Sequence, residues 1–533
     1  MLLPTPVTCA LVLALAALAS AVSTASDKYT AHTSNGPIIG HDAADGDVIE
    51  YLGIPYAQPP TGPLRFAAPQ KYVNSNNATF IASHYGPTCP QTPSARVAYP
   101  DRTPQAQRIV AAFAGQLNHT QSEDCLTLNI WTPASASSAS SPQNATEPLL
   151  PILVFIHGGR FTIGESHTPF FAGGPLSASQ RLVVVTLNYR VGIFGFPASP
   201  AAPKNLAFRD QRLGVEWVRD NAAAFGGDAG RIVVAGQSAG GAAVDYWTYA
   251  WRGEEEAVVA GVVAHSGNAW SFPRNGGEEA AGRWWNVTEA VGCGGEGEEE
   301  AKVLACMRGV DVEKVKAGVA AIRLPPVNGQ GRSEAVFQPT VDGETVFDLE
   351  AMEAMTERGE FARVPYLVGN THFEAGYYRW AAYGAGSILT DAQWDAFNLA
   401  TFTCPSTYGA AARARFGVPS WLFRYGADWD NLRLYPNSSA YHGSDMHALF
   451  GNSELVTGIP DEERQKRLTD VVMGAWAAFA RDPWRGLEEL GWGQYANDTL
   501  VELGFNKSAV PSFVSPMKYA AECASLNLTY WDL

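Results

Sequence analysis

One serine of the chain lies between two glycines, in the sequence Gly236-Gln237-Ser238-Ala239-Gly240. The continuous apolar run at residues 232–235 predicts a buried strand directly before it, and a helix can follow it. A sharp turn from strand to helix needs small residues beside the serine, strains its backbone and exposes its hydroxyl. The N-terminus of the next helix then lies beneath the negative charge that develops when the serine attacks. The pattern therefore predicts Ser238 as a nucleophile.

The elements that position this serine are predicted by alternating apolar runs and helical stretches. The apolar runs are residues 152–156, 182–187, 232–235 and 366–368, and the helical stretches are residues 206–218 and 471–479. Continuous apolar runs are typical of central strands that are buried on both faces. The chain is therefore predicted to be an α/β protein with a mostly parallel sheet flanked by helices. Residues 134–148 and 292–300 are predicted to be surface loops.

Several longer stretches occur in the order in which one family of serine hydrolases carries them. They are YLGIPYA at 51–57, EDCLTLNIW at 123–131, NYR at 188–190, DQR at 210–212 and FGGD at 225–228, ahead of the serine motif. From about Gly36 to the C-terminus, the chain resembles the type-B carboxylesterases and lipases, which include the cholinesterases. The resemblance implies an α/β-hydrolase fold, with elaborated loops around an active-site gorge, and the hydrolysis of carboxylic esters.

A nucleophilic serine needs a histidine that takes its proton and a carboxylate that orients the histidine. Of ten histidines, His442 lies in the sequence YHGSDM, which resembles the family's loop with the base. Glu374 lies in GNTHFEAG, which resembles the loop with the acid and follows the apolar run at 366–368. The order Ser238, Glu374, His442 is the order expected for this fold. His447 and Asp445 are the alternative base and acid, and each is more readily explained as a structural residue.

The predicted strand at 152–156 leads into His157-Gly158-Gly159-Arg160. By resemblance, the backbone N–H groups of Gly159, Arg160 and Ala239 form the oxyanion hole. The family usually has Gly or Ala where this chain has Arg160. Either the Arg160 side chain points away from the site and packs elsewhere, or it crowds the acyl pocket or pairs with a carboxylate on the substrate. The two alternatives stay open.

Six cysteines remain once the N-terminal segment containing Cys9 is set aside, and they show neither CxxC pairs nor Cys/His metal spacing. Disulfides are therefore favoured over zinc, and neither a metal nor a cofactor is predicted. The resemblance implies the pairs Cys89–Cys125, Cys293–Cys306 and Cys404–Cys523. The first loop has apolar residues at helical spacing (Ile109, Val110, Phe113 and Leu117), and it is either a movable lid, as in lipase relatives, or a fixed wall.

Two departures from the family bear on the substrate. The loop between Cys89 and Cys125 contains no Trp, and Gln237 replaces the acidic residue of cholinesterases, so choline esters are not the expected substrates. The stretch from Glu374 to Cys404 is shorter than in relatives, which predicts a reshaped entrance to the site.

The N-terminus is predicted to be a signal peptide, residues 1–21, with an apolar run at 11–19 and small residues at the cleavage site. Residues 22–533 are then one secreted catalytic domain. Eight sequons support export, at Asn77, Asn118, Asn144, Asn286, Asn437, Asn497, Asn506 and Asn527. A net charge of −16 argues against nucleic acid or an anionic membrane surface as a partner, and no other apolar run is long enough for an integral membrane segment.

The favoured function is hydrolysis of a small-molecule or lipid ester through an acyl-enzyme on a Ser-Glu-His triad. The alternatives are a triacylglycerol lipase with a lid at 89–125, and a catalytically silent adhesion or binding relative. The sequence leaves open the acyl chain length, the alcohol, the physiological substrate and the oligomeric state.

Overall fold

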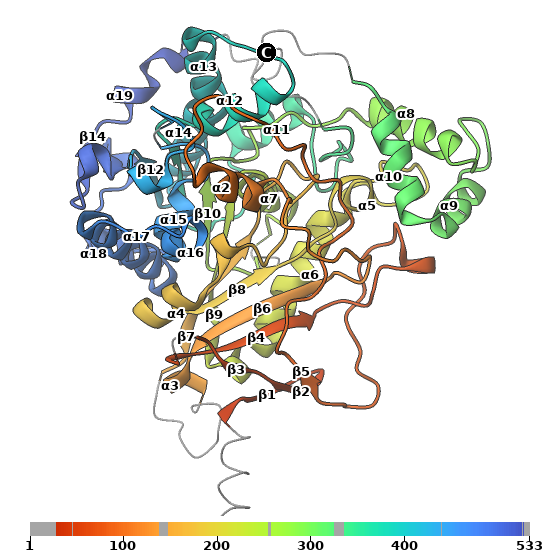
Figure 1. Cartoon of the computed structure of the whole chain (residues 1–533), viewed down its shortest axis with the longest axis horizontal. Coiled ribbons are helices and arrows are strands. Elements are labelled where there is room, and N and C mark those ends of the chain that lie inside the picture. The colour runs from red at the N-terminus through yellow and green to blue at the C-terminus, as the bar shows by residue number, and fades with distance from the viewer. Residues whose placement is uncertain are drawn as a thin grey trace, which may run out of the picture.

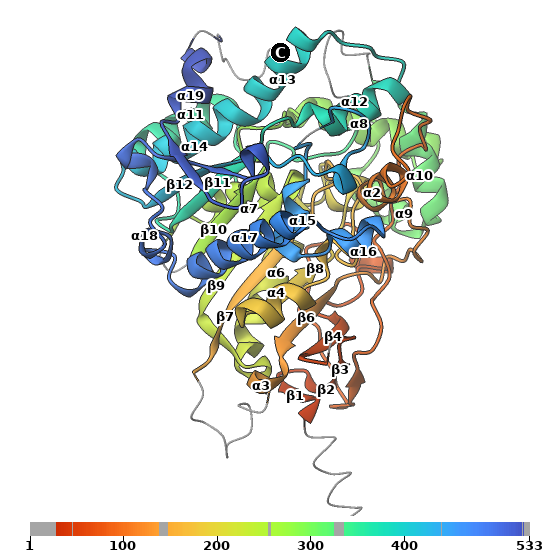
Figure 2. The ribbon, with the colours of Figure 1, turned by 60° about the vertical axis from the view of Figure 1, so that its left-hand side comes forward.

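The computed structural model describes residues 28–44, 46–137, 148–253, 257–324, 335–438, 440–524 and 526. An eleven-stranded sheet runs through the molecule with helices packed against it (Figures 1 and 2). The predicted signal peptide and the sequons at Asn144 and Asn527 lie outside the described residues. Within the described part of the chain, no helix has the length and apolar character needed to cross a membrane. The single domain at 22–533 stays a prediction.

Four strands at the centre of the sheet correspond to the four predicted apolar runs. They are β7 (Leu150–Ile156), β8 (Val183–Leu187), β9 (Gly227–Gln237) and β11 (Tyr366–Thr371). Every residue of β7, β8 and β11 is buried, as expected for strands covered on both faces. The predicted α/β class with a mostly parallel sheet is confirmed.

The other strands extend this centre on both sides. They are β3 (His41–Asp42), β4 (Val48–Pro55), β6 (Thr127–Pro133), β10 (Gly261–His265), β12 (Ser420–Tyr425), β13 (Leu500–Leu503) and β14 (Ser512–Val514). The strand order is β14-β13-β12-β11-β10-β9-β7-β8-β6-β4-β3, and the seven strands from β13 to β8 are parallel. A second, three-stranded sheet consists of β1 (Thr30–Thr33), β2 (Gly36–Ile39) and β5 (Phe80–Ile81).

The helices that precede the acid loop are α2 (Ala106–Phe113), α3 (Ala134–Ser137), α4 (Gly174–Gln180), α5 (Gly192–Gly195), α6 (Leu206–Asn221), α7 (Ala239–Ala250), α8 (Gly277–Ala290), α9 (Glu300–Gly309), α10 (Val312–Ala321) and α11 (Leu349–Arg358). Those that follow are α12 (Ala375–Gly384), α13 (Asp391–Asn398), α14 (Cys404–Arg415), α15 (Asp445–Phe450), α16 (Ser453–Thr457), α17 (Glu463–Arg481), α18 (Gly486–Glu489) and α19 (Met517–Ala520). Helices α8 to α10 form a lobe at the right of Figure 1, away from the C-terminal helices α17 to α19.

The sheet separates two hydrophobic cores, because successive residues of a strand point to opposite faces. Ile152, Val154 and Ile156 of β7 belong to one core with residues of α6 and α7. Leu153 and Phe155 belong to the other core with residues of α17. The predicted helices at 206–218 and 471–479 are both confirmed and are longer than the patterns indicated, since α6 and α17 extend beyond their apolar stripes.

The loop predicted at 134–148 begins as a helical turn. Helix α3 covers Ala134–Ser137, and the Ala136 side chain is buried beside Gly226, so packing converts the start of this Ser/Ala-rich segment into helix. Residues 138–147 lie outside the described residues. The Gly/Glu stretch at 292–300 contains no helix or strand until α9 begins at Glu300, as predicted.

Three disulfides join the pairs that the resemblance implied. Cys89 binds Cys125, Cys293 binds Cys306 and Cys404 binds Cys523, with sequence separations of 36, 13 and 119 residues. The third ties α14 to the C-terminal end of the described chain.

Loop length gives a ranking of the disulfides that experiment can check. In the chain-entropy account a crosslink stabilises by restricting the unfolded chain, by about 5 kcal/mol for the Cys404–Cys523 loop and about 3 kcal/mol for the Cys293–Cys306 loop. We expect Cys404→Ala/Cys523→Ala to lower the urea midpoint more than Cys293→Ala/Cys306→Ala. Equal midpoints for the two double variants would contradict this ranking.

Candidate active site

The Ser238 turn joins β9 directly to α7. Ser238 has φ 58° and ψ −123°, a strained conformation for a residue with a side chain. A Cβ on Gly240 would lie 2.1 Å from the Ile156 carbonyl oxygen, and one on Gly236 would lie 2.3 Å from the Gly240 backbone. Any side chain at position 236 or 240 would collide with neighbouring backbone atoms, so both positions must be glycine. This requirement explains why the motif has a glycine two residues on either side of the serine.

Glu374 and His442 form a buried hydrogen-bonded pair. His442 Nδ1 donates to Glu374 Oε2 at 2.5 Å, and the carboxylate also accepts the Thr371 backbone N–H at 2.7 Å. Glu374 is fully buried, and it follows the end of β11, two strands along the sheet from β9. With Nδ1 bonded to the carboxylate, the imidazole presents Nε2 as an acceptor, the form that a general base requires.

The acceptor nitrogen of His442 faces the end of β9. Nε2 lies 3.1 Å from the Gln237 side-chain amide nitrogen and 3.4 Å from the Tyr378 hydroxyl. In the described structure, no hydrogen bond joins Nε2 to the hydroxyl of Ser238, the residue next to Gln237. Catalytic hydrogen bonds are often long without substrate and tighten when it binds. The structure thus pairs Glu374 with His442 and sets His442 beside the serine turn.

The loop after β7 lies against the serine. A Cβ on Gly158 would be 2.9 Å from the Ser238 Cβ. Three consecutive residues of this loop have positive φ, at 109° for Gly159, 59° for Arg160 and 60° for Phe161. Ala239 is the first residue of α7, so its N–H has no partner within that helix. The three predicted oxyanion donors therefore come from segments that meet at Ser238.

The Arg160 side chain faces the aromatic residues of α12. Burial lowers the pKa of its guanidinium, and the nearby Tyr377 and Tyr378 oppose that shift. Burial also raises the pKa of Tyr377 to about 12, with Arg160 opposing the rise. The Tyr378 ring is 5.0 Å from the His442 ring. The guanidinium is therefore buried near Tyr377 and Tyr378, and the two alternatives for the role of Arg160 stay predictions.

Aromatic rings enclose the site. Tyr378 and Phe402 lie 5.0 and 5.2 Å from the His442 ring, centroid to centroid. Phe113, from α2 in the Cys89–Cys125 loop, packs 4.2 Å from Phe170, and a Cβ on Gly443 would lie 2.9 Å from its ring. Ser238 and His442 are only 5% and 7% exposed. The first disulfide loop therefore forms part of the wall over the site.

The alternative base and acid have other contacts. The His447 ring packs 4.5 Å from Phe170, and burial lowers its pKa to about 3. Asp445 bonds to His265 Nδ1 at 2.7 Å, and the other nitrogen of His265 accepts from Trp476 at 2.8 Å. This pair anchors the segment that follows His442 to β10 and α17.

The sequence profile of the carboxylesterase family matches residues 27–392 of this chain. The chain belongs to the carboxylesterase family. Its sheet and helices are the α/β-hydrolase fold of that family, and it is a carboxylic ester hydrolase.

Curated relatives span nearly all of this carboxylesterase. It is 33% identical to a cholinesterase of Mus musculus, over 93% of this chain and 79% of the relative. A chlorogenic acid esterase of Aspergillus niger is 31% identical, over 88% and 85% of the two chains. A relative named secreted lipase 5, of Gibberella zeae, is 29% identical, over 92% and 93%.

Sequence reasoning overlooked the contact between Gln237 and the base of this carboxylesterase. In the sequence, position 237 shows only that the acidic residue of cholinesterases is replaced by Gln. Its contact with His442 could have been expected, because a side chain next to the proposed nucleophile must lie close to the histidine. The aromatic wall was also overlooked, apart from Phe113, because Tyr377, Tyr378 and Phe402 belong to segments without a recognisable motif.

Replacing Gln237 should change the pH dependence of the carboxylesterase. In Gln237→Glu a carboxylate beside Nε2 stabilises a positively charged imidazole, so the acidic limb of the kcat/KM profile should move up by about 1 pH unit. Gln237→Met, of similar size and uncharged, should move the limb by less than half as much. Identical limbs in the wild type and Gln237→Glu would show that position 237 does not face the working base.

Proposed function

We propose that this carboxylesterase works through an acyl-enzyme on Ser238, with His442 as the base and Glu374 as its orienting acid. The observation that carries the proposal is the buried 2.5 Å hydrogen bond between His442 and Glu374, beside a strained serine turn. Ser238 and Glu374 follow the carboxyl ends of β9 and β11, two parallel strands of one sheet, at the edge where open α/β sheets bind their ligands.

The proposed reaction has two acyl transfers. Ser238 Oγ attacks the ester carbonyl while His442 Nε2 accepts its proton, and the backbone N–H groups of Gly159, Arg160 and Ala239 stabilise the oxyanion. His442 then gives the proton to the departing alcohol, which leaves an acyl-serine. Water, activated by the same histidine, cleaves the acyl-serine and frees the acid. These steps require neither a metal ion nor an organic cofactor.

The buried aromatic wall favours a small ester held in an enclosed pocket as the substrate. A long-chain triacylglycerol requires the α2 segment to move away, because Phe113 packs over the His442 loop. The lipase is therefore the second candidate, and the relative named a lipase supports it. In a lipase, the loop at 89–125 would be a movable lid. In an esterase for small substrates, the same loop is a fixed wall.

We also propose that the protein is exported and glycosylated. The asparagines of all six sequons within the described residues are exposed. Three disulfides favour an oxidising compartment, and one relative is named as secreted.

Hydrolysis of nitrophenyl acetate, butyrate, octanoate and palmitate tests the reaction and separates its two substrate classes. Ser238→Ala and His442→Ala should each lower kcat by about 10⁴-fold or more, and Ser238→Ala should lose labelling by a fluorophosphonate probe. His447→Gln, at the alternative base, should stay within about tenfold of the wild type. A best rate on acetate or butyrate supports the esterase, and a best rate on emulsified palmitate supports the lipase.

Two outcomes would contradict the mechanism. If Ser238→Ala kept the wild-type turnover, Ser238 would not be the nucleophile. A folded wild type with neither turnover nor labelling would instead support the silent binding relative.

We propose that the buried Arg160 guanidinium gives the enzyme a preference for acidic substrates. Arg160→Ala should lower kcat/KM about tenfold on nitrophenyl hemiglutarate, which carries a carboxylate, and leave nitrophenyl butyrate nearly unchanged. Arg160→Gly is the backbone control, because glycine adopts a φ of 59° without strain and keeps the N–H. Equal losses on the two esters would assign the side chain to packing.

A further inference from the structure

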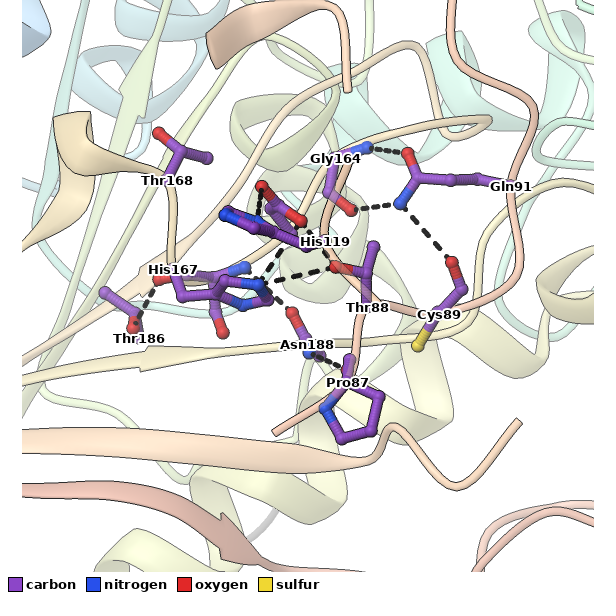
Figure 3. Close-up of polar contacts among 12 residues, drawn as sticks. Pro87, Thr88, Cys89, Gln91, His119, Gly164, His167, Thr168, Thr186 and Asn188 are labelled. Atoms are coloured by element: carbon purple, nitrogen blue, oxygen red, sulfur yellow. Dashed lines mark hydrogen bonds and ion pairs between the residues drawn. The ribbon is translucent and has the colours of Figure 1, made fainter. Parts of the chain in front are cut away.

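Two histidines and a glutamate that are not among the proposed catalytic residues lie close together. Figure 3 shows the two histidines, His119 and His167, near Thr88. His119 Nδ1 lies 2.8 Å from Glu165 Oε1, and His167 Nε2 lies 3.4 Å from Glu165 Oε2. One nitrogen from each imidazole and one carboxylate oxygen all lie within 4.8 Å of one another. None of these residues takes part in the proposed acyl transfer.

The three residues come from two segments that are far apart in the sequence. His119 belongs to the Cys89–Cys125 loop, six residues before its second cysteine. Glu165 and His167 follow the oxyanion segment, five and seven residues after Arg160. The Gln91 side chain joins the same two segments, since its amide bonds to both the N–H and the carbonyl of Gly164 at 2.8 and 3.0 Å. Any ligand held by all three residues therefore crosslinks the loop over the site to the oxyanion segment.

The burial of the cluster favours a bound cation. The Glu165 and His167 side chains are 5% and 6% exposed, whereas His119 is 37% exposed and opens to solvent. His119 and Glu165 line a cavity of about 320 Å³. A nearly buried carboxylate needs a positive or hydrogen-bonding partner, and both imidazoles lie on the Glu165 side chain. The cavity leaves room for a water on the open side.

The ligand geometry is close to that of a zinc site. Zinc binds imidazole nitrogen and carboxylate oxygen at about 2.0–2.2 Å, so tetrahedral ligand atoms lie about 3.3 Å apart. The 2.8 Å separation ends on Glu165 Oε1 and the 3.4 Å separation on Oε2, and one ligand atom from each residue lies within 4.8 Å of the others, so a bound metal requires only small side-chain movements. The Thr88 hydroxyl donates to Glu165 Oε2 at 2.5 Å, and the Tyr85 ring stacks on His167 at 5.3 Å, so both ligands are held by outer contacts, as is usual for metal ligands.

We propose that His119, Glu165 and His167 bind one Zn²⁺, with a water from the cavity as the fourth ligand. The site is structural, because its metal would fasten the Cys89–Cys125 loop to the segment after the oxyanion donors. Without a metal, contacts with His119 and the Thr88 hydroxyl hold the Glu165 carboxylate, and this metal-free cluster is the alternative that the experiment must exclude.

Zinc binding by the tag-free secreted protein tests the site. After EDTA treatment and desalting at pH 7.5, titration with ZnCl₂ should saturate at one Zn²⁺ per chain, and Co²⁺ should give the visible absorption of a four-coordinate site. His119→Ala should weaken Zn²⁺ binding by at least about tenfold, and His119→Ala/His167→Ala should abolish it. The matched control is His32→Ala, at another exposed histidine, and it should bind like the wild type.

Hydrogen exchange provides a second measurement of the crosslink. Zn²⁺ should slow amide exchange at residues 118–122 and 163–168 in the wild type, with no such change in His119→Ala. Since the His119 side chain is partly exposed, that variant should fold, which circular dichroism checks. Absent saturable binding in the wild type, or equal binding by the double variant and His32→Ala, would overturn the site. Binding without slower exchange in either segment would overturn the crosslink.

Discussion

The parallel pairing of β7 with β9 is the constraint on which the active site depends. Ile156 pairs with Gly236 at the carboxyl ends of these strands, so the loop that follows each strand begins at the same edge of the sheet. β8 lies on the far side of β7, whereas β10, β11 and β12 extend beyond β9, and this pair is therefore the point at which the strand order reverses. Glycines at 158, 236 and 240 let the two backbones approach closely enough for the oxyanion loop to contact the serine turn.

Buried ion pairs hold the surrounding segments to this centre. Arg190 binds Asp210 through two hydrogen bonds, at 2.8 and 2.6 Å, and also donates to the Ala67 carbonyl. Arg413 of α14 donates to Asp245 of α7 at 2.6 Å. Removing one partner of such a pair leaves an uncompensated buried charge, which is strongly destabilising. Arg190 belongs to the NYR stretch and Asp210 to the DQR stretch. The two stretches are separate in the sequence, and this ion pair joins them in the structure.

The site combines strain with enclosure. Ser238, Arg160 and Phe161 all have positive φ, and such conformations persist only where the surrounding packing fixes them. Here the fixing contacts include backbone against backbone at Gly158 and Gly240, and the packing of Phe161 against the buried Phe196 ring. The aromatic rings around the site leave Ser238 and His442 almost fully buried, so access of substrate depends on the α2 segment or on the side chains around it.

The sequence by itself determined the elements whose signals are local. Continuous apolar runs identified β7, β8, β9 and β11, because central parallel strands are buried on both faces, and glycine spacing identified the serine turn. The pairings of the six cysteines followed from the family resemblance.

Only the tertiary structure decided which side chains meet across those elements. The contact of Gln237 with His442, the burial of Arg160 near Tyr377 and the meeting of His119 with Glu165 and His167 join segments that lie far apart along the chain. Spacing along the sequence carries no information about such contacts. They depend on how the loops at the carboxyl edge of the sheet pack together, and that packing is set by side-chain shape and close backbone approach, which have no period in the sequence.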